Sequence, residues 1–374
     1  MKKVSFIFGT RPEAIKLAPI ILAMRADGSL QAHVCVTAQH RQMLDQVLEV
    51  FDIVPDVDLR LMRENQTLAD LTSRSIQAID EYLADHRPDL ILVQGDTTTV
   101  FCGSLCGFYR RVLVGHVEAG LRTWNKHAPY PEEINRALTT RLADYHFAPT
   151  NWSRDNLLRE GVPAESIQVT GNTVIDALLM AVEKVKAVRP AITRLPHGVL
   201  DRQPIVLVTG HRRENFGGGI DSICRAIETL SRQFPSVTFI YPVHLNPNIN
   251  EPVRRILCGL HNVFLIDPQD YLPFVYLMER ATVILTDSGG VQEEASALGK
   301  PVLVMRDTTE RPEIVDSGAA KLVGTNPTSI VTAVTAFLEA TPTDECVRES
   351  PYGDGQAAGR ILAACKTVLL GARG

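Results

Sequence analysis

Short apolar runs alternate with longer amphipathic segments along the whole chain. In the first half, apolar runs predict strands at residues 4–8, 33–37, 90–94, 112–117, 145–148 and 167–169. These runs are continuous, as expected for strands that are covered on both faces of a parallel sheet. Segments of helical length lie between them at residues 13–25, 41–51, 68–85, 100–109 and 132–142. The second half repeats the pattern, with apolar runs at 205–209, 237–241, 263–266, 283–286 and 302–305. This alternation predicts an α/β protein with doubly wound parallel sheets.

A proline-rich polar stretch separates the two halves. Residues 188–203 contain Pro190, Pro196 and Gly198, and Pro204 follows them, which is typical of a linker. We therefore expect two Rossmann-like domains facing across a cleft. Ligands of open α/β sheets bind outside the carboxyl ends of the strands, so the functional residues should follow the strands.

The composition is that of an ordinary globular protein. The 374 residues are 45% hydrophobic and 22% charged, with a net charge of −5. A mildly acidic chain is a poor general binder of nucleic acid or of anionic membranes. The apolar runs are shorter than the roughly 18 residues of a membrane span, and the run behind Lys2-Lys3 is too short for a signal peptide. The seven cysteines form no C-x-x-C pair, so we expect buried, reduced thiols in a cytoplasmic protein.

Charged residues gather where the strands of the first half end. Arg11 and Lys16 flank the start of a helix after Gly9, which suits an anion, although an ordinary strand–helix turn has the same pattern. The segment matches neither the dinucleotide fingerprint nor the P-loop. Asp96, after the strand at 90–94, is either a functional carboxylate or a helix N-cap.

Two further segments add carboxylates to this edge. His116 and Glu118 lie in a glycine-rich strand end, where an unpaired charge is costly. They are weak candidates for a metal site, because no other ligands stand at metal spacing. Glu132 and Arg136 are four residues apart on one helix face. This spacing predicts either a surface ion pair or a site carboxylate that the loop at 123–129 moves into place as a lid.

The second half carries groups that suit a diphosphate. His211 is followed by two arginines and a run of three glycines. Ser288-Gly289-Gly290 opens a helix, so a phosphate can reach the backbone N–H groups there. Glu294 can accept hydrogen bonds from a ribose diol, and Arg311 can neutralise the same diphosphate. His244, after another strand, is on its own more often a structural residue.

Together these segments resemble the non-hydrolysing UDP-N-acetylglucosamine 2-epimerases of bacteria. The resemblance extends over nearly the whole chain. It is carried by Phe8-Gly9-Thr10-Arg11-Pro12-Glu13, Ala38-Gln39-His40-Arg41, Gln94-Gly95-Asp96-Thr97-Thr98-Thr99, Gly115-His116-Val117-Glu118-Ala119-Gly120, Gly171-Asn172-Thr173-Val174-Ile175-Asp176, Leu303-Val304-Met305-Arg306-Asp307-Thr308-Thr309-Glu310-Arg311-Pro312-Glu313 and Pro351-Tyr352-Gly353-Asp354-Gly355.

The resemblance implies a fold and a set of partners. The family fold is the glycosyltransferase-B type, with domains here at residues 1–188 and 189–354 and a C-terminal helix at 355–374 that packs on the first domain. The family uses no metal and no other cofactor, acts on UDP-GlcNAc and UDP-ManNAc, and includes many homodimers. We expect neither nucleic acid nor membrane as a partner.

Site residues follow from the resemblance motif by motif. The implied catalytic group is Asp96, Glu118, Glu132 and His211. The implied substrate and UDP ligands are Arg11, Lys16, Arg136, His244, Gln269, Phe274, Ser288, Gly289, Gly290, Glu294 and Arg311, with Gln269 and Phe274 at the uracil. Gln39, His40 and Gln42 match a second, regulatory substrate site. All of these are positions of the printed sequence.

The resemblance also implies elimination of UDP to a 2-acetamidoglucal and its re-addition, which supplies ManNAc units for surface polysaccharide. Such a route suits the chemistry, because the C2 proton of the sugar is acidic only once C1 becomes cationic. Three alternatives remain open at this point: a UDP-sugar-dependent glycosyltransferase of the same fold, a non-catalytic UDP-sugar sensor, and a hydrolysing relative that releases free ManNAc.

Overall fold

The computed structural model describes residues 1–37, 41–61, 63, 66–212, 215–309, 311–339 and 350–371, without the side chains of residues 41–43. The chain forms two compact units. Unit 1 comprises Met1–Ala177 and Tyr352–Gly374, and unit 2 comprises Leu178–Pro351. The sequence predicts the domain boundary after residue 188, whereas the two compact units divide between Ala177 and Leu178.

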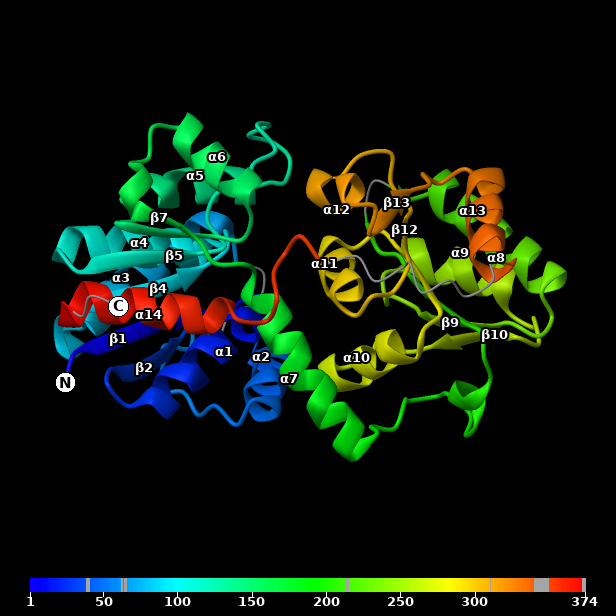
Figure 1. Ribbon diagram of the computed structural model, residues 1–374, viewed down its shortest axis with the longest axis horizontal. Helices are drawn as coiled ribbons and strands as arrows, with labels where there is room; N and C mark the ends of the chain where they lie inside the picture. Colours follow the sequence, from blue (N-terminus) through cyan, green and yellow to red (C-terminus); the bar gives the residue numbers. More distant parts are fainter. Residues whose placement is uncertain are drawn as a thin grey trace. The chain divides into compact units, whose positions relative to one another are not determined.

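Unit 1 contains a parallel seven-stranded sheet in the order β3-β2-β1-β4-β5-β6-β7 (Figure 1). The strands are β1 Lys3–Phe8, β2 Gln31–Val36, β3 Val57–Asp58, β4 Leu90–Gln94, β5 Leu113–Val117, β6 Tyr145–Ala148 and β7 Ile167–Val169. The helices are α1 Arg11–Asp27, α2 Arg41–Val50, α3 Leu68–His86, α4 Thr98–Arg110, α5 Glu132–Leu142, α6 Asn151–Arg159, α7 Thr173–Val188, which runs on into unit 2, and α14 Ala357–Leu370, with the 3-10 turn η1 Ala164–Ser166.

Unit 2 contains a parallel six-stranded sheet in the order β10-β9-β8-β11-β12-β13. The strands are β8 Ile205–Thr209, β9 Thr238–Pro242, β10 Val263–Ile266, β11 Val283–Thr286, β12 Val302–Val304 and β13 Ala320–Leu322. The helices are α8 Gly218–Gln233, α9 Pro247–Leu257, α10 Tyr271–Arg280, α11 Gly289–Ala297, α12 Pro312–Asp316 and α13 Pro327–Glu339, and η2 spans Val199–Asp201.

The expected α/β fold with doubly wound, Rossmann-like sheets is confirmed in both units. Apolar runs identified the long central strands, but the short edge strands β3 and β13 were not predicted. Val57 and Asp58 of β3 are only half-buried, and Lys321 in the middle of β13 is exposed. Strands of two or three residues that include a charged residue leave no continuous apolar run in the sequence.

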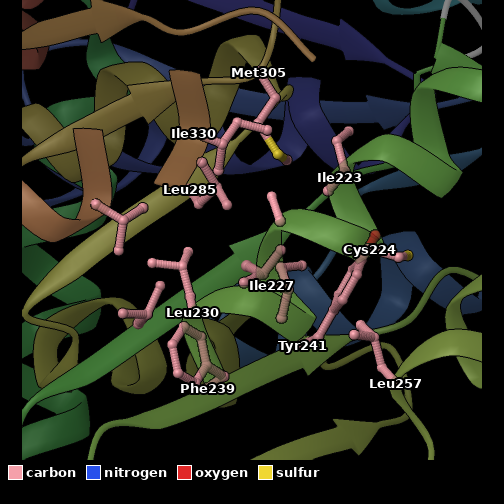
Figure 2. Close-up of a cluster of buried hydrophobic side chains, with 14 of the residues drawn as sticks. Ile223, Cys224, Ile227, Leu230, Phe239, Tyr241, Leu257, Leu285, Met305 and Ile330 are labelled. Carbon is pink, nitrogen blue, oxygen red and sulfur yellow. The ribbon is translucent and has the colours of Figure 1, made fainter. Parts of the chain in front are cut away.

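The core of unit 2 shows why its strands read as apolar runs (Figure 2). Ile223, Ile227 and Leu230 of α8 are at most 1% exposed and pack with Phe239 and Leu285 of the sheet. Burial of each such side chain stabilises the fold by about 1.5–3 kcal/mol. This core covers one face of the sheet, and Leu207, Ile240 and Ile284, which alternate to the other face, are also 0% exposed.

Each sheet reverses its strand order once. In unit 1 the reversal lies between the neighbouring strands β1 and β4, and in unit 2 it lies between β8 and β11. Loops leave the two strands in opposite directions at such a point, which opens a crevice for a ligand at the carboxyl edge. The segments after these four strands contain Arg11, Asp96, His211 and Ser288, and the neighbouring strands are followed by further site residues.

The last helix, α14, belongs to unit 1 and packs against α1. Ile361 and Cys365 are buried in this contact. The backbone N–H of Ala358 donates a 2.9 Å hydrogen bond to Asp176 at the start of α7. The chain thus returns to its first unit after completing the second.

The described cysteines carry free thiols, and all except Cys258 are buried. Burial raises the pKa of Cys102 and of Cys106 to about 12, so both thiols are protonated at neutral pH. In the part of the chain that the structure describes, the helices are all too short or too polar to cross a bilayer.

Candidate active site

Glu118 is at the centre of a polar cluster in unit 1. It follows β5 with a backbone φ of 63°, a left-handed conformation that is strained for a side-chain-bearing residue and is often found at functional sites. Its Oε1 accepts hydrogen bonds from Lys16 Nζ at 2.5 Å and from Asn172 Nδ2 at 2.9 Å. Its Oε2 accepts from Gln94 Nε2 at 2.5 Å. Three elements therefore fix this carboxylate, which is only 9% exposed.

Asp96 lies in the turn after β4 and is paired with Arg136. Arg136 Nε donates to Asp96 Oδ2 at 3.1 Å, and the terminal guanidinium nitrogen donates to the same oxygen. Arg136 also donates to Glu133 Oε2 at 3.1 Å. The N-cap of α4 is Thr97, which accepts from Val100 N, so the interpretation of Asp96 as the N-cap is wrong.

The predicted pairing of Glu132 with Arg136 is also wrong. Arg136 is 8% exposed and turns inward to Asp96 and Glu133, because α5 presents residues 133 and 136 to the sheet edge. Glu132 is half-buried at the first turn of α5 and has no hydrogen bond or ion pair with the described residues. The same holds for the Arg11 side chain, at the first turn of α1. Both groups are available to a ligand.

His116 supports the turn that carries Asp96. Its Nε2 donates to Gly95 O at 2.7 Å. Burial lowers the pKa of His116 to about 3, so the ring is neutral. No group of three or more metal-ligating side chains occurs among the described residues, so the suggestion of a His116–Glu118 metal site gains no further ligands.

Asp287 organises the corresponding edge of unit 2. It follows β11, is fully buried, and its Oδ2 accepts from the backbone N–H groups of His211 and Arg212, each at 3.0 Å. Asn215 Nδ2 donates to the same oxygen at 3.1 Å. The Asp287 carboxylate thus holds the turn after β8 beside the start of α11.

His211 projects from that turn toward His244. Its ring is stacked on His244 with centroids 5.9 Å apart, and its Nδ1 is 3.7 Å from Asp287 Oδ1. Desolvation lowers the pKa of His211, although the Asp287 charge acts in the opposite direction. The ring is half-exposed, so it can meet a ligand.

An open helix N-terminus lies at Ser288-Gly289-Gly290. Ser288 is the N-cap of α11, and its side chain makes no cap hydrogen bond. A methyl group at Gly290 would meet no atom within 4 Å, so the space above this turn is free. Free N–H groups, the positive end of the helix dipole and open space suit a phosphate.

The remaining predicted ligands of unit 2 flank this turn. Glu294 lies one turn into α11 and is 8% exposed. Arg311 Nε donates to the buried Glu293 Oε1 at 2.5 Å, so its guanidinium is oriented by α11. Gln269 is hydrogen-bonded to Asp267 O at 2.7 Å and precedes α10, in which Phe274 is half-buried.

Comparison with known proteins assigns the chain to a family. The sequence model of the family described as UDP-N-acetylglucosamine 2-epimerase matches residues 22–366. The chain belongs to the UDP-N-acetylglucosamine 2-epimerase family. The family and enzyme class that the sequence motifs predicted are thereby confirmed.

Individual epimerases are similar over their full length. The UDP-N-acetylglucosamine 2-epimerase of Yersinia pestis is 58% identical over 369 residues, which cover 97% of this chain and 98% of the relative. A crystal structure of UDP-GlcNAc 2-epimerase from Neisseria meningitidis bound to UDP-GlcNAc has 48% identity and a TM-score of 0.88, covering 97% of this chain and 99% of the other. The Methanocaldococcus jannaschii enzyme in complex with UDP-GlcNAc and UDP has 34% identity and a TM-score of 0.79, with the same coverage.

Sequence analysis missed several polar partners within this epimerase chain. Gln94 and Asn172 hold Glu118, Asp287 and Asn215 hold the His211 turn, and Glu293 holds Arg311. Gln94 had a usable signal, since it is a buried polar residue at the end of an apolar strand. Gln39 and His40 lie outside the described residues, as does the side chain of Gln42, whose backbone is in α2.

Proposed function

We propose that the chain interconverts UDP-GlcNAc and UDP-ManNAc by elimination and re-addition of UDP. The C1–O bond breaks and its electron pair leaves with UDP. A base removes the C2 proton, and the C2–H electron pair forms the C1=C2 double bond of a 2-acetamidoglucal. A proton then returns to the opposite face of C2 and UDP attacks C1. This route explains inversion at a carbon that has no adjacent carbonyl.

The carboxylates of unit 1 handle the sugar. Glu118 and Asp96 are held by hydrogen bonds, and Glu132 has no partner among the described residues, so the set offers both fixed and available carboxylates. Proton transfer by positioned carboxylates contributes about 10²–10⁴-fold to such a step. Negative charge beside C1 and C2 also stabilises the oxocarbenium-like transition state. Lys16 and Arg136 orient these carboxylates and the substrate.

Unit 2 binds UDP. The diphosphate is bound by the N-terminus of α11 at Ser288, Gly289 and Gly290, and its developing charge is stabilised by His211 and Arg311. In unit 1, Arg11 stabilises negative charge of the substrate. Glu294 binds the ribose diol, Gln269 and Phe274 bind the uracil, and His244 supports His211. The observation that carries the proposal is the fixed, buried Glu118 carboxylate in a chain of this family, because a sensor that only binds UDP-sugar needs no such group.

The reaction in deuterated water tests the route. Wild-type enzyme and UDP-GlcNAc should give UDP-ManNAc with deuterium at C2, without an acceptor and without free ManNAc as the main product. Mass spectrometry detects the incorporated deuterium, and proton NMR shows whether it is at C2 of UDP-ManNAc. Retention of the original C2 hydrogen would rule out the elimination, and acceptor-dependent release of UDP would indicate a glycosyltransferase instead.

We also propose a cytoplasmic homodimer, in which the UDP-ManNAc product serves surface-polysaccharide synthesis. The dimer proposal is supported by exposed apolar side chains on two helices of unit 1. Phe108 and Tyr109 of α4 are 59% and 65% exposed, and Ile134 and Leu138 of α5 are 41% and 44% exposed. Light scattering on the Ile134→Asp/Leu138→Asp variant should give a monomer, and an unchanged dimer would show that another surface is used.

A regulatory substrate site at Gln39, His40 and Gln42 belongs to the same proposal. UDP-ManNAc alone should then react very slowly until a trace of UDP-GlcNAc is added. A prompt reverse reaction without UDP-GlcNAc would remove these residues from a regulatory role.

A further inference from the structure

The turn that carries Asp96 is held by side chains from three elements. His116 of β5 donates to Gly95 O at 2.7 Å, and Asn135 of α5 donates to Asp96 O at 3.0 Å. Thr97 Oγ1 donates to Glu13 Oε1 of α1 at 2.8 Å. Each residue of the turn is therefore tied to a different part of unit 1.

Glu13 connects this turn to the one that carries Arg11. Its Oε2 accepts from the backbone N–H groups of Gly9 at 3.1 Å and of Thr10 at 2.7 Å, both in the turn after β1. Its Oε1 accepts from Thr97, in the turn after β4. One carboxylate, 1% exposed, thus joins the two loops on either side of the strand-order reversal of unit 1.

An ordinary capping box explains only part of this arrangement. Glu13 is the third residue of α1, and its bond to Thr10 N is the usual capping contact. Asp70 makes the same kind of contact at the start of α3, where it accepts from Thr67 N, but it is exposed and has no hydrogen bond to a second turn among the described residues. The bonds of Glu13 to Gly9 and Thr97 are additional, and a buried carboxylate is costly unless such donors satisfy it.

We propose that Glu13 is a positioning residue of the epimerase, which sets the distance between the Arg11–Lys16 segment and Asp96. The inference rests on the proposed function, in which the first segment stabilises charge and Asp96 acts beside the sugar ring. Loss of the connection lets the Asp96 turn shift, and a displacement of about 1 Å at a reacting centre lowers the rate about 100-fold.

A glutamine at position 13 can keep the connection. Its amide oxygen can accept from Gly9 and Thr10, while its NH₂ group donates to Thr97 Oγ1, whose hydroxyl hydrogen turns away. The geometry then survives without the charge. An alanine removes all of these bonds, so the two variants separate positioning from charge.

The test compares Glu13→Ala, Glu13→Gln and the matched control Asp70→Ala in the full chain. Steady-state kinetics give kcat and KM for UDP-GlcNAc, calorimetry gives the Kd of UDP, and urea unfolding gives stability. We expect Glu13→Ala to lower kcat about 100-fold, with KM and the UDP Kd changed by less than about threefold. Asp70→Ala loses a similar helix cap, yet should keep the wild-type kcat, and Glu13→Gln should stay within about fivefold of the wild type.

Equal kcat values for Glu13→Ala and Asp70→Ala would overturn the inference, as would a Glu13→Gln enzyme as slow as Glu13→Ala. If Glu13→Ala does not fold, Thr97→Ser and Thr97→Ala decide instead, with Thr150→Ala as the control for loss of an N-cap, since Thr150 caps α6 in the same way. Thr97→Ser should be active and Thr97→Ala slow.

A wild-type chain that does not epimerise UDP-GlcNAc refutes the proposed function itself, whereas an active wild type with an equally active Glu13→Ala refutes only this inference.

Discussion

The two units place their polar residues at the same topological point but use different chemistry there. In unit 1 the edge carries charged side chains that pair with one another, such as Glu118 with Lys16 and Asp96 with Arg136. In unit 2 the edge carries glycines and free backbone N–H groups, with the half-exposed His211 beside them. A doubly wound sheet therefore supplies the position, and the residues after its strands decide whether the position suits proton transfer or phosphate binding.

A buried carboxylate crosses the strand-order reversal in both units. Glu13 extends from the turn after β1 to the turn after β4, and Asp287 extends from the turn after β11 back to the turn after β8. Each satisfies backbone N–H groups that would otherwise be buried without partners. In both units the buried carboxylate fixes the two loops at the strand-order reversal, whereas the exposed residues on these loops differ between the units.

The largest expected effect separates chemistry from binding. Glu118→Gln should lower kcat by about 10³-fold, because in the proposed function this carboxylate exchanges protons or faces C1. The UDP Kd from calorimetry should stay within about threefold, since the proposed function assigns UDP binding to unit 2. An unchanged kcat would remove Glu118 from the catalytic set.

The corresponding change in unit 2 should act on binding. Asp287→Ala leaves the N–H groups of His211 and Arg212 without their acceptor. We expect the UDP Kd to rise at least tenfold, and the free energy of unfolding to fall by about 3 kcal/mol. Asp221→Ala is the control, because Asp221 is a half-buried residue of α8 that pairs with Arg255. A UDP Kd equal to that of the control would show that the turn keeps its shape without Asp287.

Acid should destabilise unit 1 before unit 2. Burial lowers the pKa of His116 to about 3 and that of His146 to about 4, while the unfolded chain binds protons near pH 6.5. Between pH 6.5 and 5 each histidine therefore removes about 2 kcal/mol of stability. Glu13, whose pKa burial raises to about 6, offsets about 1 kcal/mol in the same interval, because protonation favours its folded form.

Hydrogen exchange by mass spectrometry at pH 7 and pH 5 measures this difference unit by unit. The described histidines of unit 2, namely His197, His211, His244 and His261, are all exposed, so its protection should change less. Earlier loss of protection in β8–β11 than in β5–β6 would contradict the prediction.

The smallest expected effect tests the open helix start. Gly290→Ala adds a methyl group where no atom lies within 4 Å, so it should stabilise α11 by up to about 1 kcal/mol. The same methyl group would occupy space needed by a phosphate, and the UDP Kd should rise about three- to tenfold. Gly359→Ala in α14 is the matched control, since it also meets open space. Equal UDP Kd values for the two variants would show that the diphosphate does not bind at the N-terminus of α11.

The fold was predictable because burial on both faces of the sheets leaves long apolar runs, as in β4 and β8. The positions of candidate residues after strands were predictable for the same topological reason. The pairings of these residues were not predictable. Lys16 and Glu118 are 102 residues apart in the sequence. The spacing of Glu132 and Arg136 suggested an ion pair, but Arg136 lies on the inward face of α5 and pairs with Glu133 instead. Asp287 was not predicted, because the neighbouring Ser288-Gly289-Gly290 indicates a phosphate-binding helix start and the sequence gives no sign that Asp287 binds the distant turn after β8.

The return of α14 to unit 1 has a consequence for biosynthesis. On the ribosome, the strands of the first sheet are made before unit 2, but the helix that covers α1 is made after it. Unit 2 is an insertion within unit 1, so all of its residues are synthesised before α14. Unit 2 can therefore fold while the surface of α1 that α14 covers is still exposed. Removal of α14 should therefore destabilise unit 1, whose sheet is synthesised first.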